Sequence, residues 1–188
     1  EFECSWSANI SGSIYGKIIQ KMEDNKKISN FPYDPGYPCD VYFDIGISDQ
    51  TAIIFTQQIG RALFVIDCYN DSNKSLDFYA DYIRKKGYNI RNYVFPHDIE
   101  QRELSTGHSR KEYAFSMGMR PIKVCPKLSI EDGLHAGQIL LAKTFIDRSN
   151  CKPFLDALKW YHRKWLDKQR TFSKPVHDHS SHYSDAWR

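Results

Sequence analysis

Three runs of apolar and β-branched residues follow one another closely between residues 40 and 70. They read DVYFDIGIS, TAIIFTQQ and ALFVIDCYN, and the short segments DQ and IGR separate them. Runs of this composition are typical of strands, and connections this short join antiparallel neighbours. The pattern therefore predicts a three-stranded antiparallel meander from Asp40 to Asn70.

Apolar residues recur at helical spacing after the meander. The segment SLDFYADYIRKK, from Ser75 to Lys86, places on one face Leu76, Tyr79, Ala80 and Ile83. Gly87 stands where a helix would stop. The next run, YNIRNYVF at residues 88–95, has the composition of a strand. Because this strand is reached through a helix, we expect it to pair in parallel with an earlier one.

The rest of the chain alternates helical patterns with one short strand. We predict a short helix over Lys111–Met117, a short strand in PIKVC at residues 121–125, and two longer helices at residues 128–147 and 151–170. Ser129 and Asp132 form a capping box for the first long helix. Three antiparallel strands followed by helix-linked parallel strands describe an α/β mixed sheet flanked by helices. This is the connectivity of the ribonuclease H-like fold.

The first 39 residues are less clearly patterned. Residues 14–27 favour a short helix, and FPYDPGYPCD then brings three Pro and one Gly into ten residues. We interpret residues 1–39 as a linker or N-terminal extension and residues 40–188 as one nuclease-sized domain.

Length and composition narrow the class of protein. A chain of 188 residues with 41% hydrophobic content suits one domain, or one domain with an extension. No apolar run is long enough for a membrane span, and the N-terminus lacks the pattern of a signal peptide. Five widely spaced Cys without a CxxC motif indicate reduced thiols of a cytosolic protein. The net charge of +3 permits a nucleic-acid partner without requiring one.

Asp44 stands inside the first strand run, between apolar neighbours. Burying a carboxylate there is costly unless it is paired or binds a cation. Gly46 removes a side chain two residues further on, which lets a backbone or a ligand approach closely. The alternative is a half-exposed strand aspartate without a functional role.

Two further aspartates stand at the ends of later elements. Asp98 follows the strand in YNIRNYVFPHD, and ligands gather at the carboxyl ends of parallel strands. Asp185 would lie in the first turn of a last helix opened by Ser181 or Ser184. The plainer interpretations are a turn cap for Asp98 and dipole complementation for Asp185. Neither position by itself decides between the two.

The three aspartates indicate more together. Carboxylates and water are the natural ligands of Mg²⁺ and Mn²⁺. A two-metal phosphodiesterase needs acids from separate elements that converge on two ions about 3.5–4 Å apart. Asp44 on a first strand, Asp98 after a later strand and Asp185 on a last helix fit this requirement.

A series of segments resembles the C-terminal nuclease domain of large terminase subunits of tailed phages. They are DIGISDQTAIIF, VIDCYN, SLDFYADYIRKKGY, VFPHDIEQRELSTGHSR, PKLSIEDGLHAGQILL and HDHSSHYSDAWR, in order from about residue 40 to the end. The resemblance implies a ribonuclease H-like fold and metal-dependent cutting of DNA during genome packaging. The metal-binding acids that it implies are again Asp44, Asp98 and Asp185. EFECSWSANISGSIYG resembles the segment that joins the motor of that family to its nuclease.

Other acids rank below these three. Asp49 is a candidate accessory ligand, Asp67 in VIDCYN is a strand acid near the sheet centre, and Asp178 is either a further ligand or a turn former. Ribonuclease H itself usually has a Glu among its ligands, so an all-aspartate site departs from that wider group. The sequence lacks GxxxxGK[ST], so we expect no ATP hydrolysis by this chain alone.

The histidines near the C-terminus do not have the spacing of a zinc site. They are His177, His179 and His182, and His97 adjoins Asp98. We expect His97 and His182 to orient an acid or a water, or to touch phosphate, and hydrogen bonding at a helix start is an equal alternative.

A polar, basic loop follows Asp98. Its candidate DNA contacts are Arg102, Thr106, His108, Ser109, Arg110 and Lys111. Such a loop suits the backbone phosphates next to a cleavage site, and a solvated loop is the alternative.

The sequence thus predicts a metal-dependent endonuclease that cuts concatemeric viral double-stranded DNA with two Mg²⁺ or Mn²⁺ ions. The alternatives are a Holliday-junction resolvase or transposase-like nuclease on the same fold, and a non-catalytic DNA-binding or assembly module. The resemblance implies a portal and a small terminase subunit as partners of the full-length protein, no membrane, and a location in the cytoplasm of the bacterial host.

Overall fold

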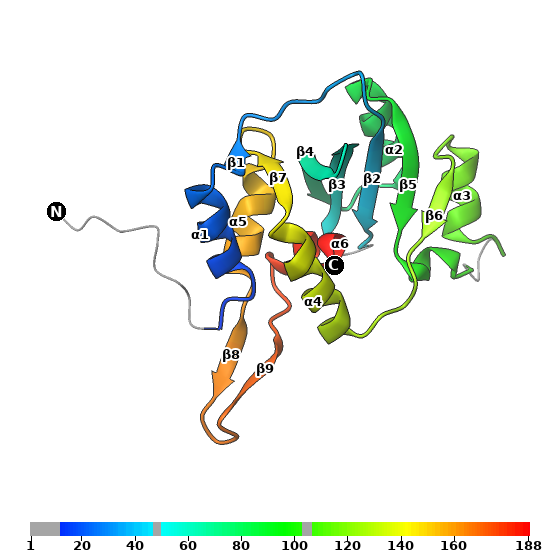
Figure 1. Cartoon of the computed structure of the whole chain (residues 1–188). Coiled ribbons are helices and arrows are strands. Elements are labelled where there is room, and N and C mark those ends of the chain that lie inside the picture. Colours follow the sequence, from blue (N-terminus) through cyan, green and yellow to red (C-terminus); the bar gives the residue numbers. More distant parts are fainter. Residues whose placement is uncertain (1–11, 47–49, 103–106) are drawn as a thin grey trace.

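A seven-stranded mixed sheet forms the centre of the protein (Figure 1). The computed structural model describes residues 12–46, 50–102 and 107–188. The strand order is β1-β7-β4-β3-β2-β5-β6. The bounds are β1 Ile28–Ser29, β2 Cys39–Asp44, β3 Gln50–Ile59, β4 Ala62–Ser72, β5 Ile90–Phe95, β6 Ile122–Val124 and β7 Thr144–Asp147.

The predicted meander is confirmed as the centre of this sheet. β2 pairs with β3, and β3 with β4, in antiparallel register. β5 lies parallel to β2 on the other side, with Tyr42 opposite Val94. β6 extends the sheet parallel to β5, and β7 lies parallel to β4. The predicted mixed α/β architecture is therefore correct, and the ends of β2 and β5 share one edge of the sheet.

Helices cover both faces of the sheet, as Figure 1 shows. One face carries α1 (Gly16–Asp24), α4 (Ile130–Leu141), α5 (Lys152–Trp160) and α6 (Ser181–Trp187). The other carries α2 (Leu76–Lys86), the 3₁₀ turn η1 (His97–Glu100) and α3 (Arg110–Ser116). Among the described residues, no helix has the length and apolar character that crossing a membrane requires.

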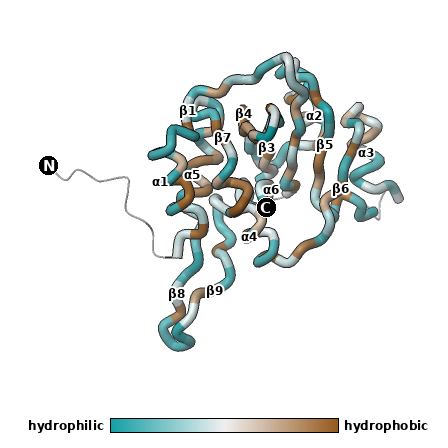
Figure 2. Tube along the Cα trace, in the orientation of Figure 1, coloured by the Kyte–Doolittle hydropathy of each residue, from teal (hydrophilic) through white to brown (hydrophobic). Residues whose placement is uncertain are grey.

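The alternation of side chains along the strands builds a separate core on each face. On β3, Ala52 and Ile54 belong to the core under α1, α4, α5 and α6. Ile53 and Phe55 belong to the core under α2 and α3. Successive side chains of a strand point to opposite faces, so a run of apolar residues fills both cores. Figure 2 shows this as brown segments along the central elements, whereas the β8–β9 hairpin is mostly teal.

The N-terminal segment contributes to the first of these cores over its described residues. Tyr15, Ile19 and Met22 of the α1 region are buried there, and β1 pairs in parallel with β7. The boundary that we expected at residue 40 therefore does not coincide with a boundary in the packing.

The two long predicted helices are shorter than expected. The first ends at Leu141, and residues 144–147 form β7, whose Phe145 and Ile146 pair with Phe64 and Val65 of β4. Helical periodicity continued through these residues, but the open edge of β4 offers backbone partners that a lone helix turn cannot match.

The second long helix ends at Trp160. The chain then forms a separate hairpin of β8 (Arg163–Leu166) and β9 (Thr171–Pro175), which projects from the body in Figure 1. The rings of Trp165 and Phe172 meet edge-to-face across it at 5.0 Å. This cross-strand aromatic pair stabilises a hairpin where the sequence pattern indicated a basic helix face.

Candidate metal centre

Asp44 is the last residue of β2 and lies opposite Ala52 of β3. Directly paired residues of neighbouring strands share a face, so the carboxylate points to the side of the sheet that α6 covers. Phe43, next along the strand, packs in the core of the other face. The apolar run therefore forms the strand, and its last polar residue lies at the edge of the sheet.

Asp98 lies in η1, the turn that follows β5. Because β5 is parallel to β2, Asp98 is brought to the same edge as Asp44. Its Oδ1 is buried and has no hydrogen-bond partner among the described residues. A buried carboxylate oxygen without a donor is costly, and a cation is one group that would satisfy it.

Asp185 lies on α6, which packs across β2, β3 and α5. The helix is anchored at two points. The Tyr183 hydroxyl donates to Asn70 Oδ1 of β4 at 3.0 Å, and the Trp187 indole N–H donates to the carbonyl of Gly137 on α4 at 3.0 Å. Asp185 itself accepts a 2.6 Å hydrogen bond from Nε of Arg188.

The three carboxylates are close enough for their charges to interact. Burial raises the pKa of Asp44, and the negative charges of Asp185 and Asp98 raise it further, while the imidazole of His182 opposes them. Like charges raise a carboxyl pKa because ionising the second group costs energy against the first. The sequence prediction that Asp44, Asp98 and Asp185 share one region of the fold agrees with this electrostatic coupling.

The carboxylates are not yet arranged as a closed set of ligands. Within residues 12–46, 50–102 and 107–188, no three His, Cys, Asp or Glu side chains are gathered closely enough to hold one ion. Asp185 is instead engaged by Arg188 and Asp44 by His182. The donor chemistry nevertheless fits Mg²⁺ or Mn²⁺, because the oxygens are carboxylates and Oδ1 of Asp98 lacks a partner among the described residues.

His182 is the histidine that reaches the acids. Its Nδ1 lies 3.7 Å from Oδ2 of Asp44, which is within ion-pair range and longer than a hydrogen bond. The ring is buried and meets the ring of His177 at 5.6 Å. His177 contacts the Ser181 hydroxyl, and His97 is exposed on η1.

The lower-ranked acids have other surroundings. Asp67 lies opposite Phe55, on the other face of the sheet from Asp44, where it bonds the Tyr88 hydroxyl and pairs with Lys86 at 2.5 Å. Asp178 accepts hydrogen bonds from the backbone and hydroxyl of Ser180 and so acts as a turn former before α6. Asp49 lies outside the described residues.

The basic loop after Asp98 is partly engaged in local structure. Ser109 caps α3 in a capping box with Glu112, His108 contacts the same glutamate, and Lys111 pairs with Glu100 at 2.7 Å. Arg102 is exposed and Arg110 is half-buried, and Thr106 lies outside the described residues.

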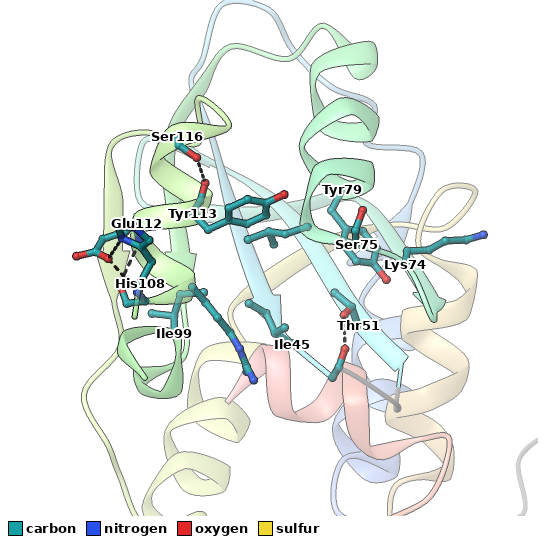
Figure 3. A pocket seen from close by; sticks show the side chains of 14 residues that line it. Ile45, Thr51, Lys74, Ser75, Tyr79, Ile99, His108, Glu112, Tyr113 and Ser116 are labelled. Atoms are coloured by element: carbon teal, nitrogen blue, oxygen red, sulfur yellow. Dashed lines mark hydrogen bonds and ion pairs between the residues drawn. The ribbon is translucent and has the colours of Figure 1, made fainter. Parts of the chain in front are cut away.

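A pocket of about 860 Å³ opens beside the acids on the α2 and α3 side of the sheet. Figure 3 shows His108, Glu112, Tyr113 and Ser116 on one side and Lys74, Ser75 and Tyr79 on the other, with Ile45 and Thr51 between them. Ile45 directly follows Asp44, and Ile99 directly follows Asp98. The pocket also has Arg110 in its wall, so it combines apolar walls with cations next to the carboxylates.

Sequence reasoning did not identify Arg188 or the close contact between α4 and α6. Arg188 stands three residues after Asp185 on a helix, a spacing at which oppositely charged side chains meet. A methyl group built on Gly137 would lie 3.1 Å from the Tyr15 hydroxyl and 3.2 Å from Cδ1 of Trp187. The i,i+3 spacing was a usable signal, whereas the glycine contact depends on tertiary packing.

Comparison with known proteins rests on structure. No family model matches the sequence, and no curated protein matches it. A full-length large terminase from a thermophilic bacteriophage superposes with a TM-score of 0.64 at 17% identity, over 90% of this chain and 43% of the terminase chain. This chain thus spans less than half the length of that terminase.

Two isolated domains match over most of both chains. The large terminase nuclease domain from bacteriophage SPP1, with bound Mn, has a TM-score of 0.58 at 19% identity, over 79% of this chain and 82% of that one. The large terminase nuclease from thermophilic phage G20c, with bound magnesium, has a TM-score of 0.59 at 12% identity, over 95% and 97%. The chain therefore has the ribonuclease H-like fold of phage large terminase nuclease domains.

Proposed function

We propose that this chain is a metal-dependent endonuclease domain that cuts concatemeric viral double-stranded DNA during genome packaging. The observation that carries the proposal is the convergence of Asp44, Asp98 and Asp185 at one edge of the sheet, where the pKa of Asp44 is raised by burial and by the other two carboxylates. The unpartnered Oδ1 of Asp98 supports it, since a cation would satisfy this atom.

Asp44, Asp98 and Asp185 would hold Mg²⁺ or Mn²⁺. Bound Mn in the SPP1 domain and bound magnesium in the G20c domain support divalent ions as the cofactor. Two ions are proposed by chemical analogy, because two-metal sites activate water and stabilise the leaving oxygen of a phosphodiester. Asp49 is a further candidate ligand.

The residues of this chain position these acids and the DNA. β2 and η1 fix Asp44 and Asp98 on adjacent parallel strands, and the anchored helix α6 brings Asp185 and His182 to them. His182 is placed to orient the Asp44 carboxylate. Lys74 and Arg110, in the wall of the neighbouring pocket, are placed to contact phosphates of a bound strand.

The partners of this function are double-stranded DNA and, in a full-length protein, a portal and a small terminase subunit. The work would take place in the cytoplasm of the bacterial host. These partners rest on the likeness to large terminases, and 43% of the full-length terminase chain is covered by the match.

The test compares two buried aspartates of neighbouring parts of the sheet. Asp44→Asn should abolish conversion of supercoiled plasmid with Mn²⁺ while the urea midpoint of unfolding stays at or above that of the wild type. Asp67→Asn is the matched control, because Asp67 is buried on the opposite face in a pair with Lys86. It should lose stability, by about 3–5 kcal/mol, and keep its cutting activity at low temperature.

If Asp67→Asn does not fold, Asp71→Asn on the exposed end of β4 replaces it as control. Undiminished cutting by Asp44→Asn would reject the proposed active site. Preferential cutting of four-way junctions over linear duplex would instead support a junction resolvase, and DNA binding without any cutting would support an assembly module.

A further inference from the structure

Arg188 occupies a protected position among the acids. Its Nε donates to Oδ1 of Asp185 at 2.6 Å, and the side chains of Arg188 and Asp185 are only 25% and 23% exposed. An ion pair that is three-quarters buried is screened less by water than a surface pair. The pair is therefore stronger than most i,i+3 pairs on helix surfaces.

The influence of Arg188 extends beyond Asp185. Burial alone would lower the pKa of the guanidinium, yet Asp185, Tyr161 and Asp44 together raise it. The positive charge of Arg188 thus interacts with two of the three carboxylates of the candidate metal centre. A divalent ion at that centre would interact with the same carboxylates.

The side chain is held in place from its far side. Gly133 of α4 has no side chain there, and a methyl group built on it would lie 3.5 Å from Nη1 and 3.6 Å from Cβ and Cδ of Arg188. The Arg188 backbone N–H continues α6 by donating to the Ser184 carbonyl at 3.0 Å. These contacts fix the guanidinium beside Asp185.

We propose that Arg188 is a built-in counter-ion of the acid cluster, which balances the carboxylates when no metal is bound and competes with a divalent ion for Asp185. The inference rests on the proposed function, in which these acids bind such an ion. It has two consequences of opposite sign. Arg188 stabilises the metal-free protein, and it weakens metal binding, because one oxygen of Asp185 must exchange a hydrogen bond for a metal contact.

The experiment measures Mn²⁺ alone, without DNA. Isothermal titration calorimetry gives the Kd of Mn²⁺, and thermal unfolding is recorded in EDTA and in saturating Mn²⁺. The variants are Arg188→Gln, Arg188→Lys and, as matched control, Arg84→Gln, because Arg84 forms an i,i+3 pair with Asp81 on α2, on the opposite face of the sheet.

We expect Arg188→Gln to unfold at a lower temperature in EDTA, since the acid cluster then loses one of its counter-charges. Its Kd for Mn²⁺ should fall about three- to tenfold, as expected for loss of a partly screened competing cation. The Mn²⁺-induced rise in unfolding temperature should exceed that of the wild type. Arg188→Lys keeps the charge and should lie between the two, and Arg84→Gln should match the wild type.

A purely structural anchor gives a different result. Arg188→Gln would then lose the same unfolding temperature in EDTA and in Mn²⁺, with an unchanged or weaker Kd, and the inference would be overturned while metal binding by the wild type upheld the proposed function. Absence of Mn²⁺ binding by the wild type would instead overturn the proposed metal centre and the competition that depends on it.

Discussion

The imidazole of His182 on the last helix lies 3.7 Å from the carboxylate of Asp44 at the end of β2. The contact joins residues from opposite parts of the chain, and it exists because α6 is anchored on the same face of the sheet to which Asp44 points. His182 is buried at this position, so the two side chains have few alternative arrangements.

His182→Ala should reduce plasmid cutting about 10- to 100-fold, the usual effect of removing the partner of a ligating carboxylate. The loss should appear mainly as a higher Mn²⁺ concentration at half-maximal cutting, because Asp44 would be less well oriented. His179→Ala is the control, since His179 is exposed on the same segment. Equal effects of the two substitutions would assign His182 no special role.

The centre of the fold could be predicted from the sequence because its signals are local. β2, β3 and β4 have strand composition, short connections and alternating burial, and all three are found where expected. Asp44 could be singled out for the same reason, since a carboxylate inside an apolar strand has few inexpensive explanations.

The parts that were missed depend on distant partners. Residues 144–147 carry a helical pattern up to the point where the edge of β4 accepts them as β7. The pairing of Asp185 with Arg188 required knowing that α6 is a helix held against α4, and the contact of Gly137 with Trp187 required the tertiary structure itself. Local propensity contains none of this information.

The contact between α4 and α6 should tolerate no added side chain at Gly137. Gly137→Ala would bring a methyl group to 3.2 Å from Cδ1 of Trp187, so α6 must shift. We expect a loss of about 1–3 kcal/mol in the free energy of unfolding and weaker Mn²⁺ binding, both measurable by urea titration and calorimetry.

Gly133→Ala is the matched control for this prediction. Its methyl group would meet Arg188 atoms at 3.5 Å or more, an ordinary contact, and alanine favours a helix. The variant should be as stable as the wild type or more stable. A similar loss for both glycine variants would show that helix propensity or another general effect, and not the Trp187 contact, decides the outcome.

The Tyr183 hydroxyl should hold α6 over the sheet through Asn70. It donates to Asn70 Oδ1, and Asn70 Nδ2 donates to Gln50 Oε1, so one chain of hydrogen bonds joins α6, β4 and β3. Tyr183→Phe removes a half-buried bond and should cost about 1 kcal/mol of stability, with a fall in cutting rate larger than that loss of folded protein explains.

Tyr113→Phe provides the comparison for Tyr183. Its hydroxyl also donates to a side-chain oxygen, that of the Asp77 carboxylate, but the residue is exposed and belongs to α3. Its stability should change by less than about 0.5 kcal/mol. A cutting rate for Tyr183→Phe in proportion to its folded fraction would show that the bond does not position the site.

Asp40 should make stability depend on pH in the acid range. Its buried carboxylate accepts hydrogen bonds from Nε of Arg91 at 3.0 Å, from Nη2 of the same guanidinium, and from Nδ2 of Asn92 at 2.7 Å. Burial alone would raise the pKa of Asp40, but the hydrogen bonds from Arg91 and Asn92 outweigh it and hold the pKa below its ordinary value.

A folded-state pKa below the unfolded value gives a stabilisation that is complete above the unfolded pKa, about 4, and is lost as the pH falls through the folded pKa. Asp40→Asn should therefore cost about 1–3 kcal/mol at pH 7, and its deficit relative to the wild type should shrink below about pH 4. Urea unfolding of both proteins between pH 7 and pH 3 measures this. The exposed Asp81, paired with Arg84, gives the control substitution Asp81→Asn, for which little change is expected at any pH. A deficit for Asp40→Asn that stays constant from pH 7 to pH 3 would mean that the lost packing, and not the charge, accounts for its effect.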